Sequence, residues 1–156
     1  MPTSNTSDYR IRAEDPGTPD ARALIDELSA ALAAITGDSG RSSFDVADVR
    51  VAGALFAVAR NAQGQVVGCG AFRPLTADVA ELKRMYARPG NPGAGSALLA
   101  FLEAAATALN YRAVWLETRA VNQRAVGFYR ARGYAPIPNY GKYIGNAAAV
   151  CLAKRL

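Results

Sequence analysis

The sequence predicts a single α/β (α+β) domain built on one mixed β-sheet. The expected elements begin with a strand and a helix, continue with three strands typical of an antiparallel meander, and end with a strand–helix–strand crossover. The 156 residues are 51% hydrophobic and 20% charged, as in ordinary globular domains. A chain of this length buries roughly two thirds of its unfolded surface, so it can form a core and hold a pocket without disulfides or metals.

The N-terminal part predicts one short strand and one long helix. Residues 1–7 are polar and are expected to be frayed, and apolar and polar residues alternate over Tyr9–Glu14 as in a strand. Thr18 is suited to cap a helix that Gly37 ends. The apolar stripe of this helix consists of Leu24, Leu28, Leu32 and Ile35. The segment 38–53 is expected to be a loop with a short helix.

Three β-prone runs follow and predict the meander. Leu55–Arg60 and Gln65–Pro74 are separated by Asn61–Gly64, which predicts a hairpin with a turn glycine. A third strand is expected over Val79–Ala87.

The C-terminal half predicts the crossover and two closing strands. A helix is expected from Gly95 to Asn110, with a stripe of Leu98, Phe101, Leu102, Ala105 and Leu109. Arg112–Thr118 has the continuous apolar run of a central strand. Asn122–Arg132 is expected to be a helix closed by a glycine. The last strands are expected from Tyr134 onward and over Ala147–Leu156.

The absence of histidine excludes several kinds of active site. Ser-His-Asp and Cys-His mechanisms and histidine-ligated metals are all ruled out. Acid–base chemistry is therefore left to Glu, Asp, Tyr, Lys or water. Cys69 and Cys151 lie far apart and form no C-x-x-C pair, so neither a disulfide framework nor a zinc site is expected. We expect no metal and a reducing compartment.

The net charge of +5 and the pI near 9.5 suit a polyanionic ligand. Nucleic acid is the less favoured partner, because the basic residues are scattered along the chain. The apolar runs are far shorter than the roughly 20 residues of a membrane span, and the first twenty residues lack a secretion signal. A cytoplasmic protein without membrane or nucleic-acid partners is expected.

The segment Gly90–Ala97 joins a strand to a helix and is rich in glycine. Such a loop presents unpaired backbone N–H groups and the positive end of a helix dipole, which together favour phosphate. The alternative is that the glycines only turn a tight corner. The segment lacks the Gly-Lys-Ser/Thr of a Walker loop, and Leu98 stands where a Rossmann fingerprint needs Gly or Ala.

The glycine loop is one of six motifs that occur in a characteristic order. The six are Glu81–Pro89, Gly93–Ala97, Leu116–Thr118, Asn122–Ala125, Phe128–Tyr129 and Gly133–Tyr134. From about Ala54 to Leu156 the chain resembles the GNAT superfamily of acyl-CoA-dependent N-acetyltransferases, and its C-terminal part is similar to a bacterial small-molecule branch. The resemblance implies six to seven strands splayed in the middle of the sheet, with helices on both faces. Lys83 and Arg84 break the alternation of their strand, which fits the family's bulge.

The resemblance implies acetyl-CoA as co-substrate. The loop amides would hold its pyrophosphate, and the edge of the preceding strand would hold its pantetheine arm. Pro92 stands where the family usually has Arg or Gln. Two expectations stay open: either Arg88 or Arg84 holds the pyrophosphate instead, or the affinity for the cofactor is low. The residues implied to bind the cofactor are Met85, Tyr86, Ala87, Arg88, Pro92, Gly93, Ala94, Gly95, Ser96, Ala97, Asn122 and Tyr129.

The resemblance also implies two catalytic residues: Tyr129 would protonate the departing sulfur, and Glu81 would serve as general base through a water. Glu117 is the competing general base, because a carboxylate at the end of a buried strand is often functional. Three structural alternatives stay open: Tyr129 as a core aromatic, Glu117 as a residue that fixes a loop, and Asn122 as a helix cap. The acceptor site is expected to include Arg73, Tyr140 and Tyr143.

The implied activity is direct transfer of acetyl from acetyl-CoA to a primary amine of a small molecule or amino acid, in a ternary complex. A non-enzymatic acyl-CoA sensor on the same fold is the alternative. The family often forms dimers, so a homodimer is a further expectation.

Overall fold

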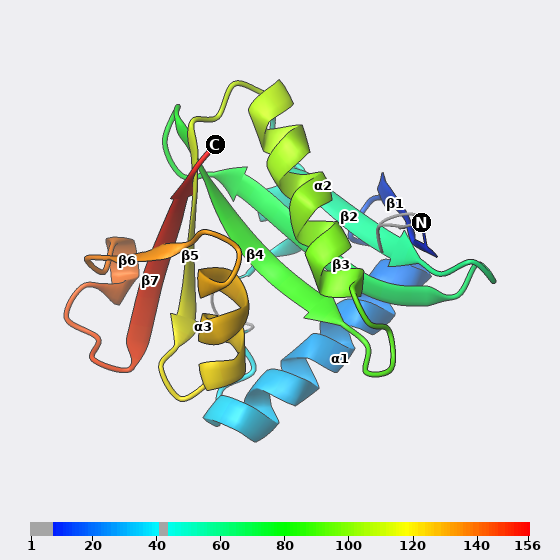
Figure 1. The fold of residues 1–156 in the computed structure, drawn as a ribbon, viewed down its shortest axis with the longest axis horizontal. Coiled ribbons are helices and arrows are strands. Elements are labelled where there is room, and N and C mark those ends of the chain that lie inside the picture. The colour runs from blue at the N-terminus through cyan, green and yellow to red at the C-terminus, as the bar shows by residue number, and fades with distance from the viewer. Residues whose placement is uncertain (1–7, 41–43) are drawn as a thin grey trace.

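The computed structural model describes residues 8–40 and 44–156, so the expected fraying of residues 1–7 lies outside the described residues. One sheet runs through the domain in the order β1-β2-β3-β4-β5-β7-β6 (Figure 1). Its strands are β1 Arg10–Ala13, β2 Leu55–Arg60, β3 Val66–Pro74, β4 Val79–Ala87, β5 Ala113–Arg119, β6 Ala135–Ile137 and β7 Ala149–Arg155. Neighbouring strands are antiparallel except β4 and β5, which are parallel. The predicted mixed sheet is confirmed.

The helices are α1 Pro19–Thr36, α2 Ala94–Ala108 and α3 Gln123–Arg130, with short 3₁₀ turns η3 Val46–Val49 and η4 Gly141–Tyr143. The Thr18 side chain caps α1 by accepting the Ala21 N–H, as predicted. The prediction that α3 extends to Arg132 is wrong by two residues. The N–H of Arg132 donates to the Tyr129 carbonyl, and Gly133 adopts φ +94°, so the chain tightens into a turn instead.

The helices cover both faces of the sheet, as the resemblance implied. On β2, Phe56 and Val58 face the cluster that contains α1, whereas Ala57 and Ala59 face the cluster that contains α2. This alternation follows from the two-residue period of a strand. Each face therefore has its own core.

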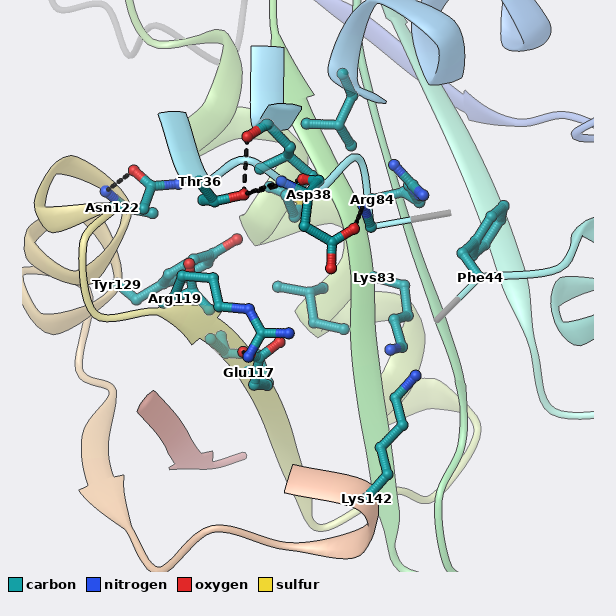
Figure 2. Close-up of a pocket in the computed structure, with 18 residues that line it drawn as sticks. Thr36, Asp38, Phe44, Lys83, Arg84, Glu117, Arg119, Asn122, Tyr129 and Lys142 are labelled. Carbon is teal, nitrogen blue, oxygen red and sulfur yellow. Dashed lines mark hydrogen bonds and ion pairs between the residues drawn. The ribbon is translucent and has the colours of Figure 1, made fainter. Parts of the chain in front are cut away.

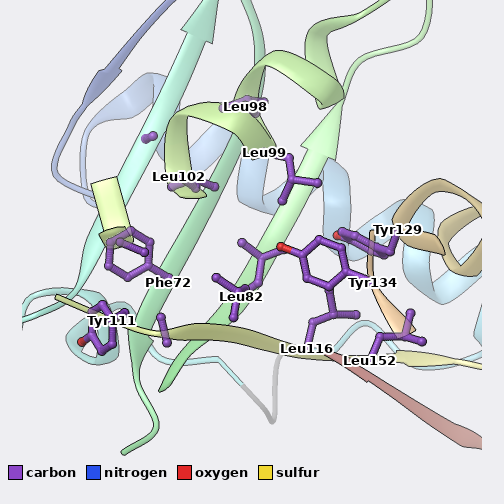
Figure 3. Close-up of a cluster of buried hydrophobic side chains, with 14 of the residues drawn as sticks. Phe72, Leu82, Leu98, Leu99, Leu102, Tyr111, Leu116, Tyr129, Tyr134 and Leu152 are labelled. Carbon is purple, nitrogen blue, oxygen red and sulfur yellow. The ribbon is translucent and has the colours of Figure 1, made fainter. Parts of the chain in front are cut away.

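The centre of the larger core is formed by three leucines of α2, which are Leu98, Leu99 and Leu102 (Figure 3). They pack against Phe72, Leu82, Leu116, Tyr134 and Leu152 from the sheet side. Two predicted members of the apolar stripes, Ile35 and Leu109, are about half exposed instead. Both lie at the C-terminal end of their helices, where the stripe has run past the core.

β4 carries a bulge where its alternation is broken, as the resemblance implied. Tyr86 lies opposite Cys69 and Lys83 lies opposite Ala71, so Gly70 faces two residues of β4. Arg84 occupies one of these two positions with φ +57°, a left-handed conformation that costs a non-glycine residue about 1 kcal/mol. Its guanidinium donates to Ser29 Oγ (3.1 Å) and lies 5.2 Å from the centre of the Phe44 ring. These contacts offset the strain.

β4 and β5 pair only at their beginnings. The ladder joins Val79–Glu81 to Ala113–Trp115 and then stops, although β5 continues to pair with β7 up to Arg119. In Figure 1 the two strands diverge from this point. The sheet is therefore splayed in the middle, as expected.

Two Gly→Ala substitutions should change stability in opposite directions. At Gly68 a Cβ would lie 2.7 Å from the Tyr86 carbonyl oxygen and 2.8 Å from Leu98 Cδ1, whereas at Gly127 it would meet nothing within 4 Å. Gly68→Ala should lower the free energy of unfolding by about 1–3 kcal/mol. Gly127→Ala should raise it by about 1 kcal/mol, because alanine favours a helix. Urea denaturation followed by circular dichroism measures both, and equal effects would contradict the packing described.

Candidate active site

A cavity of about 180 Å³ lies where β4 and β5 separate (Figure 2). Its walls are the C-terminal part of α1, the bulged part of β4, the end of β5 and the start of α3, with Lys142 of η4 also lining it. Side chains from α1 and from α3 line the opening that the missing β4–β5 ladder leaves. The cavity is thus a product of the splay.

Tyr129 lines this cavity from α3 and also belongs to the core. Its ring packs against Phe128 and Tyr134 with centroid distances of 5.1 and 5.6 Å. Within the described ranges its hydroxyl forms no hydrogen bond, and burial raises its pKa. Tyr129 is therefore a core aromatic that also lines the cavity, and its expected role as a proton donor stays a prediction.

Glu117 lines the same cavity from β5, and burial raises its pKa although Arg119, Lys83 and Lys142 act in the opposite direction. Its Oε2 lies 3.4 Å from Arg119 Nη1. Among the described residues both atoms are buried without a hydrogen-bond partner. Buried polar atoms of this kind are uncommon and call for an explanation such as a bound ligand or a catalytic role.

Glu81 has quite different surroundings. It is 2% exposed and lies outside the cavity lining. One of its oxygens accepts a hydrogen bond from Arg73 Nε (2.9 Å), and the other accepts one from the Tyr140 hydroxyl (2.7 Å). Lys83 Nζ lies 3.7 Å away. The structure therefore separates the two predicted carboxylates: one faces the cavity, and the other joins β3, β4 and the segment before η4.

The expected acceptor residues Arg73, Tyr140 and Tyr143 belong to this buried network rather than to the cavity wall. Lys142, which sequence reasoning missed, lines the cavity in their place. The one feature of the sequence that could have indicated Lys142 as a site residue is its position next to Tyr143.

The glycine loop leads directly into α2. Gly93 precedes the helix with φ +81° and provides no side-chain cap. Among the described residues the N–H groups of Gly95 and Ser96 have no partner, since the first turn of a helix leaves its amides free. The Asn91 side chain holds the loop by donating to the Arg88 carbonyl (3.0 Å). The loop can therefore receive an anion at the helix N-terminus.

The arginines expected to support this loop have other partners. Arg88 donates to both oxygens of Glu27 (2.9 and 2.6 Å), and Arg84 contacts Ser29. Arg132 reaches the loop instead, because its Nε donates to Ser96 Oγ (2.9 Å). The guanidinium of Arg132 also lies 3.9 Å from the centre of the Phe128 ring. Sequence reasoning missed Arg132, since an arginine at the end of a helix is an ordinary surface feature.

The remaining predicted residues are distributed around these two features. Met85 lines the cavity, and Ala87 lies beside the position of Gly95. Tyr86 points to the other face, where its hydroxyl donates to Glu27 (3.2 Å). The Asn122 side chain accepts the Ala125 N–H, so it caps α3 while lining the cavity.

Cys69 is a core residue. It is fully buried, its thiol donates to the Arg84 carbonyl (3.3 Å), and burial raises its pKa to about 12. A thiol in this state is unreactive as a nucleophile.

Two isosteric substitutions should distinguish the carboxylates. Glu81→Gln should lower the free energy of unfolding by about 2 kcal/mol or more, because it leaves Arg73 and Lys83 without their buried counter-charge. Glu117→Gln should change it by less than about 1 kcal/mol. Because folding raises the pKa of Glu117, its ionisation lowers stability as the pH rises through that pKa, and glutamine removes this loss. Urea denaturation at neutral pH tests the pair; a Glu81→Gln variant as stable as the parent would contradict the network.

Within the described ranges, no helix has the length and apolar character to cross a membrane. No group of three or more Cys, Asp or Glu side chains in those ranges is arranged to hold a metal ion.

Comparison with known proteins agrees with this geometry. The profile of the Acetyltransferase (GNAT) family matches residues 22–134, more than half of the chain. An IAA acetyltransferase from Azospirillum brasilense is 31% identical over 136 residues, which cover 85% of this chain and 88% of that protein.

Solved structures are similar over nearly the whole length. One described as an acyl-CoA N-acyltransferase from Klebsiella pneumoniae has 27% identity and a TM-score of 0.79, over 95% of this chain and 97% of that one. A GNAT family acetyltransferase from Elizabethkingia anophelis, with acetyl-CoA bound, shares the fold at 16% identity, with a TM-score of 0.70 over 96% and 99% of the chains. The match of the family profile and the identity to the Azospirillum protein show that this chain belongs to the GNAT family of acetyltransferases.

Proposed function

We propose that the protein is an acetyl-CoA-dependent N-acetyltransferase that acetylates a primary amine of a small molecule by direct attack in a ternary complex. One observation carries the proposal: the opening between β4 and β5 is lined by both Tyr129 and Glu117. The glycine loop follows the end of β4, and the bulged part of β4 lines the same opening, so β4 connects a phosphate site to an acid–base pair contributed by β5 and α3. The A. brasilense relative is described as an acetyltransferase, and the E. anophelis protein has acetyl-CoA bound.

The loop fits the diphosphate of coenzyme A. The free N–H groups of Gly95 and Ser96 supply donors, and the left-handed Gly93 lets the backbone approach the ligand closely. Arg132, held against Ser96, supplies the positive charge that Pro92 lacks. In this proposal the segment Gly93–Ala97 holds the diphosphate.

The pantetheine arm would lie along the free edge of β4. Beyond Glu81 this strand has no partner in β5, so the backbone of Met85–Ala87 is available for a ligand that adds to the sheet edge. Arg88 would act indirectly, by tying β4 to α1 through Glu27.

Acetyl-CoA supplies the acetyl group as a thioester. We assign the general base to Glu117 rather than Glu81, because both oxygens of Glu81 already accept hydrogen bonds. The raised pKa of Glu117 makes its carboxylate a better acceptor for the proton of the amine. The amine nitrogen bonds to the acetyl carbon and the C–S bond breaks. Glu117 takes a proton from the nitrogen, and Tyr129, which burial keeps protonated by raising its pKa, gives its proton to the departing sulfur. Solvent then takes the proton from Glu117 and returns one to Tyr129, so the net proton transfer runs from nitrogen to sulfur.

Replacing the proposed acid should affect turnover rather than cofactor binding. Tyr129→Phe keeps the ring packing but removes the proton donor, so kcat should fall by about 100-fold, while the Kd for coenzyme A stays within about threefold. Release of free thiol and titration calorimetry measure the two quantities. Tyr134→Phe is the control, because Tyr134 packs against Tyr129 but does not line the cavity.

An unchanged kcat in Tyr129→Phe would remove Tyr129 from the mechanism. A parent protein that binds coenzyme A but acetylates no amine would favour the sensor alternative.

Crowding the loop should affect cofactor binding. A Cβ at Gly95 would lie 3.4 Å from the Phe128 ring, an ordinary contact distance, so Gly95→Ala should change the Kd for coenzyme A only slightly. The two methyl groups of Gly95→Val should obstruct the amides and raise the Kd about tenfold or more. Calorimetry on both folded variants provides the test, and equal affinities would place the diphosphate elsewhere.

A cytoplasmic location and a homodimer stay predictions from the sequence.

A further inference from the structure

Two lysine side chains converge at one end of the cavity. Lys83 comes from β4 and Lys142 from η4, and in Figure 2 their ammonium groups point toward one another. Both lie near the ring of Tyr143, at 5.8 and 5.7 Å from Nζ to the ring centre. Two ammonium groups near the same ring repel each other, and an anion bound between them would offset this repulsion.

The protein provides little negative charge to compensate them. Glu81 lies 3.7 Å from Lys83 Nζ, but Arg73 and Tyr140 already occupy its oxygens. Lys142 has no hydrogen bond or ion pair within the part of the chain that the structure describes. Burial lowers the pKa of Lys83, and Arg73 and Lys142 lower it further, while Glu81 and Glu117 act in the opposite direction. This end of the cavity therefore has an excess of positive charge.

The same excess holds for the whole cavity. Among the described lining residues, four are cationic (Lys83, Arg84, Arg119 and Lys142) and two are anionic (Asp38 and Glu117). Asp38 lies on the wall that follows α1, where it accepts the Gly40 N–H (2.9 Å). Polyamines, which carry several positive charges, are therefore poor candidates for the acceptor.

Glu117 lines the cavity from β5, whereas Lys83 lines it from β4 and Lys142 from η4. Arg119 lies 3.4 Å from Oε2 of Glu117, and Lys83 and Lys142 also act on the charge of this carboxylate. This oxygen accepts no hydrogen bond within the described ranges, so one wall of the cavity offers an acceptor for an amine N–H and the other offers two ammonium groups for an anion. The cavity volume of about 180 Å³ restricts it to compact molecules.

We propose that the acceptor is a compact amino carboxylate, whose carboxylate binds between Lys83 and Lys142 while its amine faces Glu117. This inference rests on the proposed acetyltransferase function and narrows its substrate class. Binding of the carboxylate relieves the repulsion between the two lysines and fixes the direction in which the acceptor enters. α-Amino acids and ω-amino acids share this chemistry and differ in the distance between the two groups.

The test compares each acceptor with its uncharged analogue. The common L-amino acids, β-alanine and 4-aminobutyrate are each assayed with acetyl-CoA beside the corresponding carboxamide, and release of free thiol is measured. At least one carboxylate should be acetylated with a kcat/KM about tenfold or more above that of its carboxamide, as expected for one charge-assisted hydrogen bond. The better series, α or ω, identifies the spacing.

Lys142→Met should remove this preference. Lys142 is exposed at the edge of the cavity, so the variant should fold, and the KM for the preferred carboxylate should rise about tenfold while that for its carboxamide changes little. Arg22→Gln is the matched control: it removes one exposed positive charge of α1 that does not line the cavity, and it should leave both constants unchanged. Calorimetric binding of the same carboxylate in the presence of coenzyme A should weaken in Lys142→Met in parallel.

Equal transfer to carboxylates and carboxamides, or a polyamine as the best acceptor, would overturn this inference and leave the proposed function intact. A KM unaffected by Lys142→Met would overturn it too. Failure of every amine to accept acetyl would count against the proposed function, and calorimetry would then decide the inference by itself: an amino carboxylate that binds through Lys142 supports it, and the absence of any such binding overturns it.

Discussion

The early end of the β4–β5 ladder is the constraint on which the site depends. Pairing stops after Glu81 and Trp115, and the bulge at Arg84 turns β4 away from β5 while keeping it paired with β3. The left-handed Arg84 costs some stability, which contacts to Ser29 and Phe44 offset. A continuous sheet at this point would have neither a cavity nor a free strand edge, so the strain in β4 is tied to the proposed function.

The buried network around Glu81 connects β4 to β3 and to the segment before η4, at the point where β4 and β5 still pair. Arg73 connects Glu81 of β4 to Asp48 of η3, and Tyr140 connects Glu81 to the segment before η4. This network also orients Lys83, which extends from the same strand into the cavity. Lys83 therefore belongs both to the ion-pair network and to the proposed binding site. Glu81 does not line the cavity and acts on the site only by positioning Lys83.

The contrast between Glu81 and Glu117 shows how surroundings assign roles to identical groups. Both are carboxylates on neighbouring strands, yet one is saturated with hydrogen-bond donors and the other keeps an unpartnered oxygen. Burial without sufficient donors raises the pKa of Glu117, which is the state that suits a general base. The proposed role of general base thus falls to the carboxylate that the folded chain leaves with one oxygen lacking a hydrogen bond.

Much of this protein could be predicted from local sequence patterns, because alternation, helix caps and glycine turns depend on near neighbours. The meander, the crossover and the glycine loop all belong to this class, whereas the bulge and the expected role of Tyr129 came from the resemblance to the family. The partners of Glu81, the diversion of Arg88 to Glu27 and the approach of Arg132 to Ser96 could not, since each joins residues far apart in the chain. Only the tertiary structure decided which charges face the cavity. The sequence states which side chains are charged, but the packing of distant segments determines which groups surround each of them.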